Sequence, residues 1–141
     1  MRHFDKAMGA IVILGLIISL YLIYVHFQPS GLYCPNAGII NCEQVLTSSY
    51  SAILGIPLAV QAFVWFAVLG VITFYRRLWK IPAFHIVKDV WLIIGLGGIM
   101  YSVIAMHLIG KICIYCSTLD VLIACAAIVH VYHARANRVS G

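Results

Sequence analysis

Four long apolar stretches make up most of this chain and restrict what it can fold into. They cover residues 7–27, 56–75, 90–109 and 112–132. Each is close to the about 20 residues that an α-helix needs to cross roughly 30 Å of hydrocarbon. The sequence is also 64% hydrophobic and only 9% charged, a composition that would give a soluble domain a mostly apolar surface. The sequence therefore predicts an all-α membrane protein, a single domain over residues 1–141 built as a four-transmembrane-helix bundle.

The basic residues indicate how these helices are oriented. With four spans, eight of the nine Lys and Arg residues fall on the side of the two termini and the 76–89 loop, and only Lys111 falls opposite. Cytoplasmic segments are enriched in Lys and Arg, so we expect cytoplasmic termini and an outward 28–54 loop in a prokaryotic cell membrane. This pattern explains the net charge of +5 without nucleic-acid binding, because no basic stripe with interleaved aromatics lies beyond the membrane flanks.

Four of the five cysteines fall on the outer side, in two pairs. Cys113 and Cys116 form a Cys-x-x-Cys motif at the start of the fourth stretch, and Cys34 and Cys42 lie in the outer loop with seven residues between them. Disulfides form on this oxidising side of a membrane. Residues three apart share one helix face, and a helix amino terminus favours the thiolate. Two dithiols near one membrane surface therefore indicate electron transfer from a water-side partner to an acceptor in the lipid.

The outer loop contains the pattern of a short helix. Asn41 followed by Gln44 is typical of a helix start, and it places Cys42 at the first helical position. We expect an interfacial helix within residues 42–51 that lies as a lid over the mouth of the bundle. The Gly-Ile-Pro sequence at 55–57 should end it, with Pro57 in the first turn of the second span.

The order of these motifs resembles that of the vitamin K epoxide reductase family. The shared features are Cys-x7-Cys in the first outer loop, Ser48 six residues later, Gly-Ile-Pro opening the second span and Cys-x-x-Cys opening the fourth. The resemblance covers roughly residues 7–132. The bacterial four-helix thiol oxidase of the Dsb system has its Cys-x-x-Cys-type pair in the first outer loop, and the reversed order here favours the epoxide reductase family. We expect a prokaryotic-type homologue without a fused thioredoxin-like domain.

The resemblance implies a role for each cysteine of the two pairs. Cys34 faces a separate thioredoxin-like (DsbA-like) protein, and Cys42 exchanges with Cys113. Cys116 passes the electrons to a quinone of the ubiquinone, menaquinone or vitamin K type, and Ser48 corresponds to a hydroxyl near the redox centre. The implied activity is that of a quinone-dependent thiol oxidoreductase that supports disulfide bond formation.

Asp120 departs from the family pattern, because vertebrate members have a tyrosine there. Leu58 also stands where the family often has an asparagine, and both changes argue against vertebrate-like epoxide chemistry more than against dithiol oxidation. Asp120 is the one acid inside a predicted span, one helical turn beyond Cys116 on the same face. Ionisable residues in hydrocarbon are costly and usually functional or paired. Two interpretations stay open: Asp120 serves the quinone, or it is a buried acid near the interface, protonated or solvated by water, with Lys111 and His107 as candidate partners.

Most remaining residues of the spans are expected to pack. Cys125 falls on the opposite helix face from Cys116, and Tyr115 should point away from the cysteines toward lipid. Aromatic residues at span ends are typical of an interfacial belt. Three glycines should allow close helix contact: Gly95, Gly97 and Gly98. Three aromatic residues are candidates to stack on a quinone ring: Phe63, Phe66 and Tyr101.

Two other functions remain open from the sequence. The first is a non-catalytic metal-binding membrane protein, in which His26 or His107 joins the outer cysteines. Zinc sites usually contain two tightly spaced pairs, whereas one pair here has seven intervening residues, so we expect no metal. The second is a disulfide-stapled membrane subunit whose cysteines serve only stability.

Overall fold

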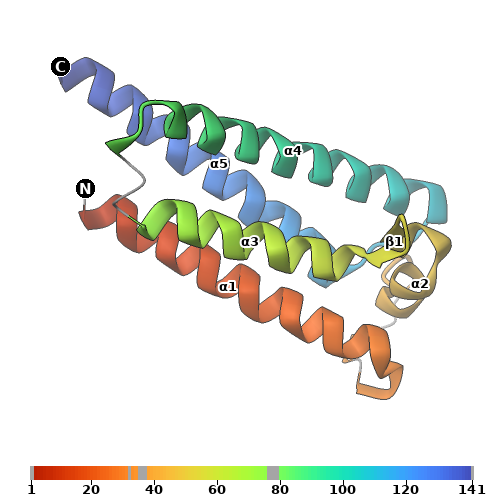
Figure 1. Ribbon diagram of the computed structural model, residues 1–141. Helices are drawn as coiled ribbons and strands as arrows, with labels where there is room; N and C mark the ends of the chain where they lie inside the picture. Colours follow the sequence, from red (N-terminus) through yellow and green to blue (C-terminus); the bar gives the residue numbers. More distant parts are fainter. Residues whose placement is uncertain (1, 32, 35–37, 76–79, 141) are drawn as a thin grey trace.

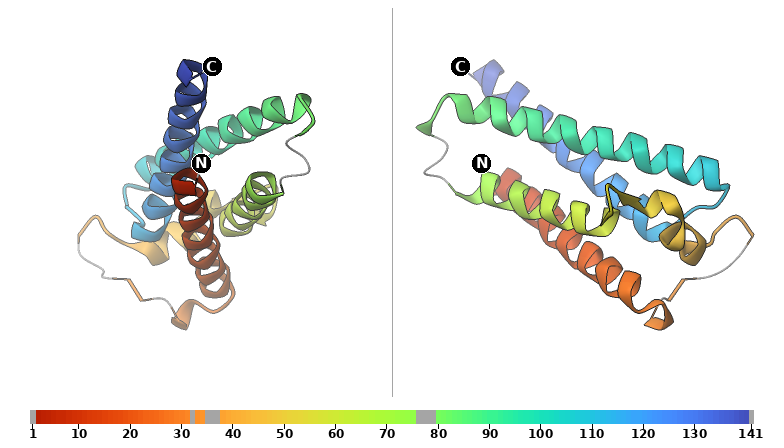
Figure 2. Two further views of the ribbon diagram at one scale, coloured as in Figure 1. Left: turned by 90° about the vertical axis from the view of Figure 1, so that its left-hand side faces the viewer. Right: turned by 45° about the vertical axis from the view of Figure 1, so that its right-hand side comes forward.

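Four long helices dominate the computed structural model (Figure 1). They lie side by side, and the first and last described residues lie at the same end as the end of α3 and the start of α4 (Figure 2). We call this the terminal end. The helices are α1 (Arg2–Phe27), α3 (Leu58–Phe74), α4 (Ala83–Ile109) and α5 (Ile114–Ser140). The structure describes residues 2–31, 33–34, 38–75 and 80–140.

Three of these helices, α1, α4 and α5, are long and apolar enough to cross a membrane. α3 is a shorter apolar helix of 17 residues. Large apolar side chains point outward from the helices, as expected where lipid replaces water around the bundle. Ile17 is 59% exposed, and similar outward residues include Ile93, Val121 and Ile128. The predicted helical membrane protein is therefore confirmed at the level of its fold class.

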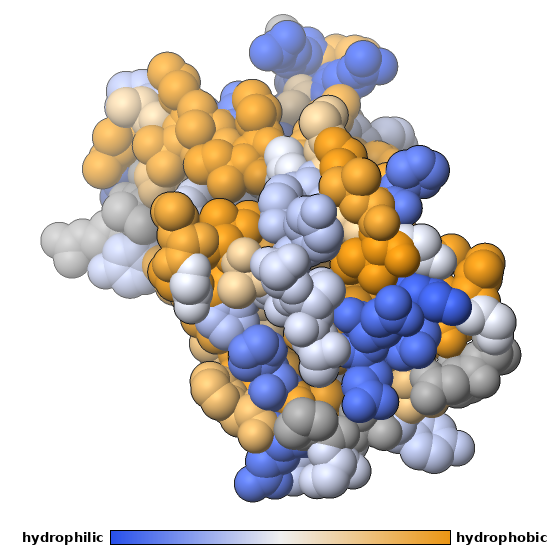
Figure 3. Space-filling view, turned by 90° about the vertical axis from the view of Figure 1, so that its right-hand side faces the viewer, coloured by the Kyte–Doolittle hydropathy of each residue, from blue (hydrophilic) through white to orange (hydrophobic). Residues whose placement is uncertain are grey.

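The short elements gather at the opposite end, which we call the cysteine end. Here lie the turn η1 (Pro29–Gly31), the helix α2 (Cys42–Thr47) and the turn η2 (Ser49–Ser51). The strands β1 (Ala52–Ile53) and β2 (Ile56–Pro57) follow as an antiparallel hairpin. Seen from this end, hydrophilic side chains lie between hydrophobic ones (Figure 3). The outer loop of the sequence thus folds as a cap on one end of the bundle.

The predicted helix start in the cap is confirmed. The backbone N–H of Gln44 donates to Oδ1 of Asn41 over 3.0 Å, and Cys42 is the first helical residue. The helix covers Cys42–Thr47, the first part of the predicted 42–51 segment. It ends at Thr47 because Ser48 adopts an extended conformation, and both the N–H and the hydroxyl of Ser48 donate to the carbonyl of Val45.

The hairpin after this helix was not predicted. Leu54 and Gly55 form its tip with φ of 54° and 80°, the left-handed conformation of a tight hairpin turn. Pro57 belongs to β2 and caps α3, so its predicted place in the first helical turn is wrong. The Nε2 group of Gln61 donates to the carbonyls of Ile53 and Ile56 and fixes the hairpin onto α3.

Glycines set the closest approaches between helices. A Cβ atom on Gly15 of α1 would lie 2.5 Å from the ring of the fully buried Phe66, and one on Gly95 of α4 would lie 2.4 Å from Trp65. The prediction of close contact is confirmed for Gly95. It is wrong for Gly97 and Gly98, where an added Cβ would meet no described atom within 4 Å.

Charged and aromatic side chains join three helices at the terminal end. Nε2 of His130 on α5 lies 2.7 Å from Oδ1 of Asp89 on α4. The ammonium of the buried Lys88 lies 5.1 Å from the ring centre of Phe4 on α1, and the same ring stacks on His133. This cluster lies at the other end of the bundle from the cysteines.

Candidate redox site

The loop cysteines form a disulfide. Cys34 and Cys42 are bonded, with their Cα atoms 6.2 Å apart. Cys42 is fully buried at the amino terminus of α2, whereas Cys34 is half-buried. An incoming thiol therefore reaches the Cys34 sulfur more easily than the Cys42 sulfur.

The second pair begins α5. Cys113 immediately precedes the helix, and Cys116 lies in its first turn, three residues later. Both are free thiols. The N–H of Cys116 donates to the Cys113 sulfur over 3.4 Å. Hydrogen bonding from the Cys116 side chain lowers the pKa of the Cys113 thiol, and burial opposes this less strongly. Cys113 is therefore the more easily ionised sulfur of a reduced pair.

The two pairs meet in one buried cluster. Cys42 and Cys113 are both fully buried and share this cluster with Val45 of α2. Cys34 and Cys116 pack against it as partly buried residues. The four cysteines that the sequence singled out are thus brought together, with the two central sulfurs shielded from solvent.

Backbone pairing joins the loop to the start of α5. The N–H of Asn41 donates to the carbonyl of Ile112 over 3.1 Å, and the N–H of Ile112 donates to the carbonyl of Ile39 over 2.8 Å. The ammonium of Lys111 adds a bond of 3.0 Å to the carbonyl of Gly38. These bonds fix the residues before Cys42 against those before Cys113. Sequence reasoning missed this bridge, because two residue pairs give no periodic pattern.

A cavity of about 470 Å³ opens beside the cysteine cluster. Its walls come from the cap, α1, α3, α4 and α5, and most of its lining side chains are apolar. Cys116 lies in the wall, whereas Cys42 and Cys113 do not. Cys116 is therefore the cysteine that a molecule in the cavity can contact.

Asp120 lies in the same wall, four residues beyond Cys116. Its Oδ2 atom is buried and has no hydrogen-bond partner among the described residues. The ammonium of Lys111 is bonded to a backbone carbonyl, and the structure gives no ion pair between Asp120 and either Lys111 or His107 within its described part. The pairing of Asp120 with Lys111 or His107 therefore finds no support. A buried polar atom without a hydrogen-bond partner lowers the stability of the folded protein. Such atoms are common at functional sites.

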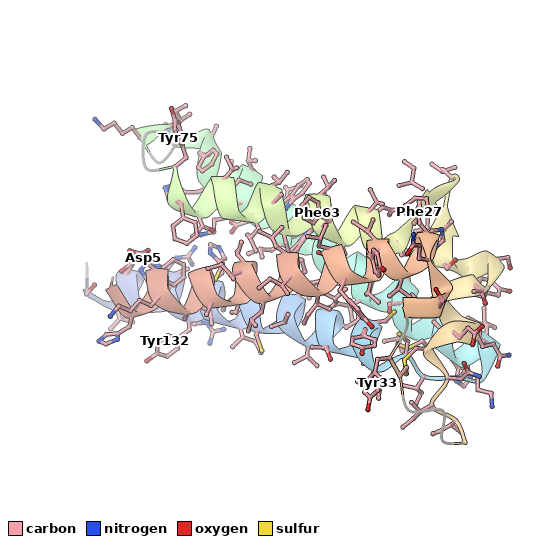
Figure 4. All side chains as sticks on the ribbon, turned by 90° about the horizontal axis from the view of Figure 1, so that it is seen from below. Asp5, Phe27, Tyr33, Phe63, Tyr75 and Tyr132 are labelled. Atoms are coloured by element: carbon pink, nitrogen blue, oxygen red, sulfur yellow. A yellow bond between two sulfur atoms is a disulfide. The ribbon has the colours of Figure 1, made fainter. Side chains whose placement is uncertain are left out.

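The predicted quinone-stacking aromatics are placed differently from one another. Tyr101 lies in the cavity wall, where its hydroxyl donates to the carbonyl of Tyr50 over 3.1 Å. Phe63 and Phe66 do not line the cavity: Phe63 lies midway along α3 (Figure 4), and Phe66 is buried in the core. Spacing along α3 could not reveal this, because adjacent faces of that helix are about equally apolar.

Other lining residues were not singled out by the sequence. Trp65 of α3 and Trp91 of α4 form part of the wall, and Gln61 contributes a polar group near the hairpin. Ser48, which the sequence did single out, also lines the cavity. Its hydroxyl donates to the carbonyl of Val45 over 2.8 Å.

The sequence predicted that Cys125 packs within the bundle and that Tyr115 faces lipid. Cys125 is half-buried on α5 and does not line the cavity. Tyr115 was expected to point toward lipid, and this is wrong, because its hydroxyl donates to the carbonyl of Tyr33 in the loop. Among the described residues, no group of three or more His, Cys, Asp or Glu is placed to hold a metal ion.

An apolar helical bundle with a disulfide at its surface, a dithiol behind it and a cavity beside that dithiol defines a membrane thiol oxidoreductase. The comparison with known families agrees. The chain belongs to the vitamin K epoxide reductase family, whose sequence model matches residues 6–131. No curated protein matches the chain.

Proposed function

We propose that this chain oxidises a thioredoxin-like, DsbA-like protein and passes the electrons to a quinone, and so supports disulfide bond formation. The position of Cys116 carries the proposal. It lies in the wall of an apolar cavity, while Cys113, three residues earlier, is buried beside Cys42. Thiol–disulfide exchange needs contact between sulfurs. The packing of the four cysteines in one cluster supports a series of such contacts that leads from the solvent side to Cys116 in the cavity wall.

The proposed enzyme is a single domain over residues 1–141 with four membrane spans. The 17 residues of α3 extend about 26 Å at 1.5 Å per residue, close to the hydrocarbon thickness of a bilayer. Both termini would then be cytoplasmic and the cysteine end outside a prokaryotic cell membrane. The charge distribution of the sequence supports this orientation.

In the first step, a thiolate of the reduced partner attacks the half-buried Cys34 sulfur. The Cys34–Cys42 bond breaks and a mixed disulfide forms. The second thiol of the partner then attacks its own sulfur of that mixed disulfide. The partner leaves oxidised, and Cys34 and Cys42 have gained two electrons and two protons as thiols.

In the second step, these electrons move to the pair on α5. The Cys42 thiolate attacks Cys113 of an oxidised Cys113–Cys116 pair and releases Cys116 as the thiolate. Cys34 then attacks Cys42, which re-forms the loop disulfide and releases Cys113. The product of this step is a loop disulfide beside a Cys113–Cys116 dithiol, which matches the bonding in the structure.

The cavity fits a quinone of the ubiquinone, menaquinone or vitamin K type. Its lining is apolar, its volume is about 470 Å³, and Asp120 adds a buried oxygen without a partner. A bound quinone supplies an acceptor for two electrons and two protons. Cys116 would deliver the electrons, Asp120 would hold or donate a proton, and Tyr101 would pack on the ring. Ser48 would support the cap end of the wall.

The proposal is tested by quinone reduction in purified protein. With dithiothreitol as the reductant and a short-chain ubiquinone analogue as acceptor, Cys113→Ala and Cys116→Ala should each abolish reduction. Cys125→Ala is the matched control and should keep the rate, because Cys125 lies outside the cavity wall. Full activity of Cys116→Ala would overturn the proposal.

The partner is tested by trapping in cells. In the Cys42→Ala protein, Cys34 has no internal sulfur to resolve a mixed disulfide. It should therefore accumulate bonded to a thioredoxin-like protein, identified by mass spectrometry. The Cys34→Ala, Cys42→Ala double variant is the control and should trap nothing.

A further inference from the structure

Two tyrosine hydroxyls hold the backbone N–H and carbonyl of one residue, Tyr33, beside the loop disulfide. The N–H of Tyr33, the residue before Cys34, donates to Oη of Tyr21 over 3.1 Å. The carbonyl of Tyr33 accepts a hydrogen bond from the hydroxyl of Tyr115. The Tyr33 side chain itself is 85% exposed and lies at the cysteine end (Figure 4). It is therefore the backbone of Tyr33 that is held.

The two tyrosines come from different helices and contact each other. Tyr21 lies on α1 and Tyr115 on α5, between the two cysteines of the second pair. Their ring centres are 5.3 Å apart and their planes tilted by 55°. The Tyr21 hydroxyl also donates to the carbonyl of Gly31 over 3.1 Å, so it donates one bond and accepts another, as a phenol can. We call Tyr21 and Tyr115 the tyrosine clamp.

The other half of the disulfide is anchored separately. Cys42 is held by the helix start at Asn41 and by the backbone pairing of residues 39–41 with Ile112. Cys34 lies on a different segment, and the backbone of Tyr33 in that segment is bonded to the hydroxyls of Tyr21 and Tyr115. The clamp is thus placed to fix the Cys34 side of the pair.

We propose that Tyr21 and Tyr115 are positioning residues that hold Cys34 next to Cys42 and thereby favour the loop disulfide over its reduced form. Fixing the backbone before Cys34 raises the effective concentration of its thiol near Cys42, because less chain entropy is lost when the bond closes. The inference rests on the proposed function in treating Cys34 and Cys42 as the pair that exchanges with the reductant.

The test measures the exchange equilibrium of the loop pair alone. In a Cys113→Ala, Cys116→Ala background, the protein is equilibrated with mixtures of reduced and oxidised dithiothreitol and the free thiols are then alkylated and counted. Reduced dithiothreitol gives two electrons and two protons to the Cys34–Cys42 bond and becomes a cyclic disulfide. The ratio of the two forms of the protein gives the equilibrium constant without any quinone.

Tyr21→Phe and Tyr115→Phe remove one hydroxyl each and keep the rings. Each should lower the equilibrium constant for the loop disulfide about 3- to 10-fold, the range expected for loss of one hydrogen bond. In the double variant the equilibrium constant should fall by less than the product of the two single decreases, because both hydroxyls hold the backbone of the same residue, Tyr33. Tyr132→Phe is the control: Tyr132 is 77% exposed on α5 and lies toward the terminal end (Figure 4), and its equilibrium constant should not change.

A merely structural role would lower the melting temperature of the oxidised and reduced proteins equally and leave the equilibrium constant unchanged. That constant staying within 2-fold of the parent in both Phe variants would overturn the inference. The two tyrosines lie on different helices, so one folded variant suffices if the other fails to fold. If the unsubstituted protein did not reduce quinone at all, that result would count against the proposed function but not against the tyrosine clamp.

Discussion

Trp65 on α3 and Trp91 on α4 donate hydrogen bonds to each other's backbone. The indole N–H of Trp65 reaches the carbonyl of Trp91 over 3.0 Å, and the indole N–H of Trp91 reaches the carbonyl of Trp65 over 3.1 Å. Both residues also line the cavity. The two bonds provide hydrogen-bond partners for both indole N–H groups in an apolar environment. They also join α3 to α4 at the cavity wall.

Trp91→Phe should therefore destabilise the bundle. It removes one bond of the pair while keeping an aromatic ring, and the free energy of unfolding should fall by about 1 kcal/mol. Denaturant unfolding in detergent, followed by circular dichroism, measures this. The Trp65→Phe, Trp91→Phe double variant should show coupling between the two sites. Strictly additive losses would contradict the idea that each bond supports the other.

Gly95 and Gly97 offer a matched pair of substitutions on one helix. Gly95→Ala would place a Cβ 2.4 Å from the Trp65 ring, whereas a Cβ at position 97 would meet no described atom within 4 Å. Overpacking costs about 1–3 kcal/mol, while alanine in an open helical position gains up to about 1 kcal/mol over glycine. Gly95→Ala should lower the melting temperature, and Gly97→Ala should hold or raise it. Equal effects would show that the α3–α4 contact is looser than described.

The sequence predicted those features that depend on neighbouring residues. Apolar length located the four helices to within several residues, and the side chain of Asn41 marked the start of α2. The order of the cysteine motifs indicated the family, which the match over residues 6–131 confirms. Each of these signals is contained in one segment, so no knowledge of packing was needed.

Features that join distant segments were missed. The Trp65–Trp91 pair, the backbone bridge at Ile112 and the bond from Tyr115 to Tyr33 each connect residues that no local pattern relates. The part of the cavity wall formed by Gln61, Trp65 and Trp91 was missed for the same reason. Apolar residues occur on every face of α3, so hydrophobic periodicity does not show that Trp65 lines the cavity and Phe66 does not.

The ionisation of Cys113 should depend on its neighbour. Hydrogen bonding from Cys116 lowers the pKa of Cys113, and burial raises it. Cys116→Ala removes the side-chain hydrogen bond and keeps the effect of burial, so the pKa of Cys113 should rise. Because the thiolate is the reactive form, alkylation of Cys113 by iodoacetamide should then begin at higher pH than in the parent. The measurement uses mass spectrometry in a background with Cys34, Cys42 and Cys125 replaced by alanine.

Cys116→Ser is the control for this shift. A serine hydroxyl can still donate to the Cys113 sulfur, so the pH profile should return toward that of the parent. Identical profiles for the alanine and serine variants would show that the neighbouring side chain does not set the reactivity of Cys113.

Asp120 should lower the stability of the folded protein and increase the rate of quinone reduction. Its buried Oδ2 has no partner among the described residues, and such a group costs about 1–3 kcal/mol. Asp120→Leu should therefore raise the free energy of unfolding by about 1–2 kcal/mol, and it should slow quinone reduction at least about 10-fold if the carboxyl serves as a proton donor. Asp120→Asn keeps the shape without the acid and should also be slow. Thr118→Val is the matched control, because Thr118 is on the same helix but does not line the cavity. Full activity of Asp120→Asn would show that the Asp120 carboxyl takes no part in the mechanism. Its unpaired oxygen would then lower stability without serving catalysis.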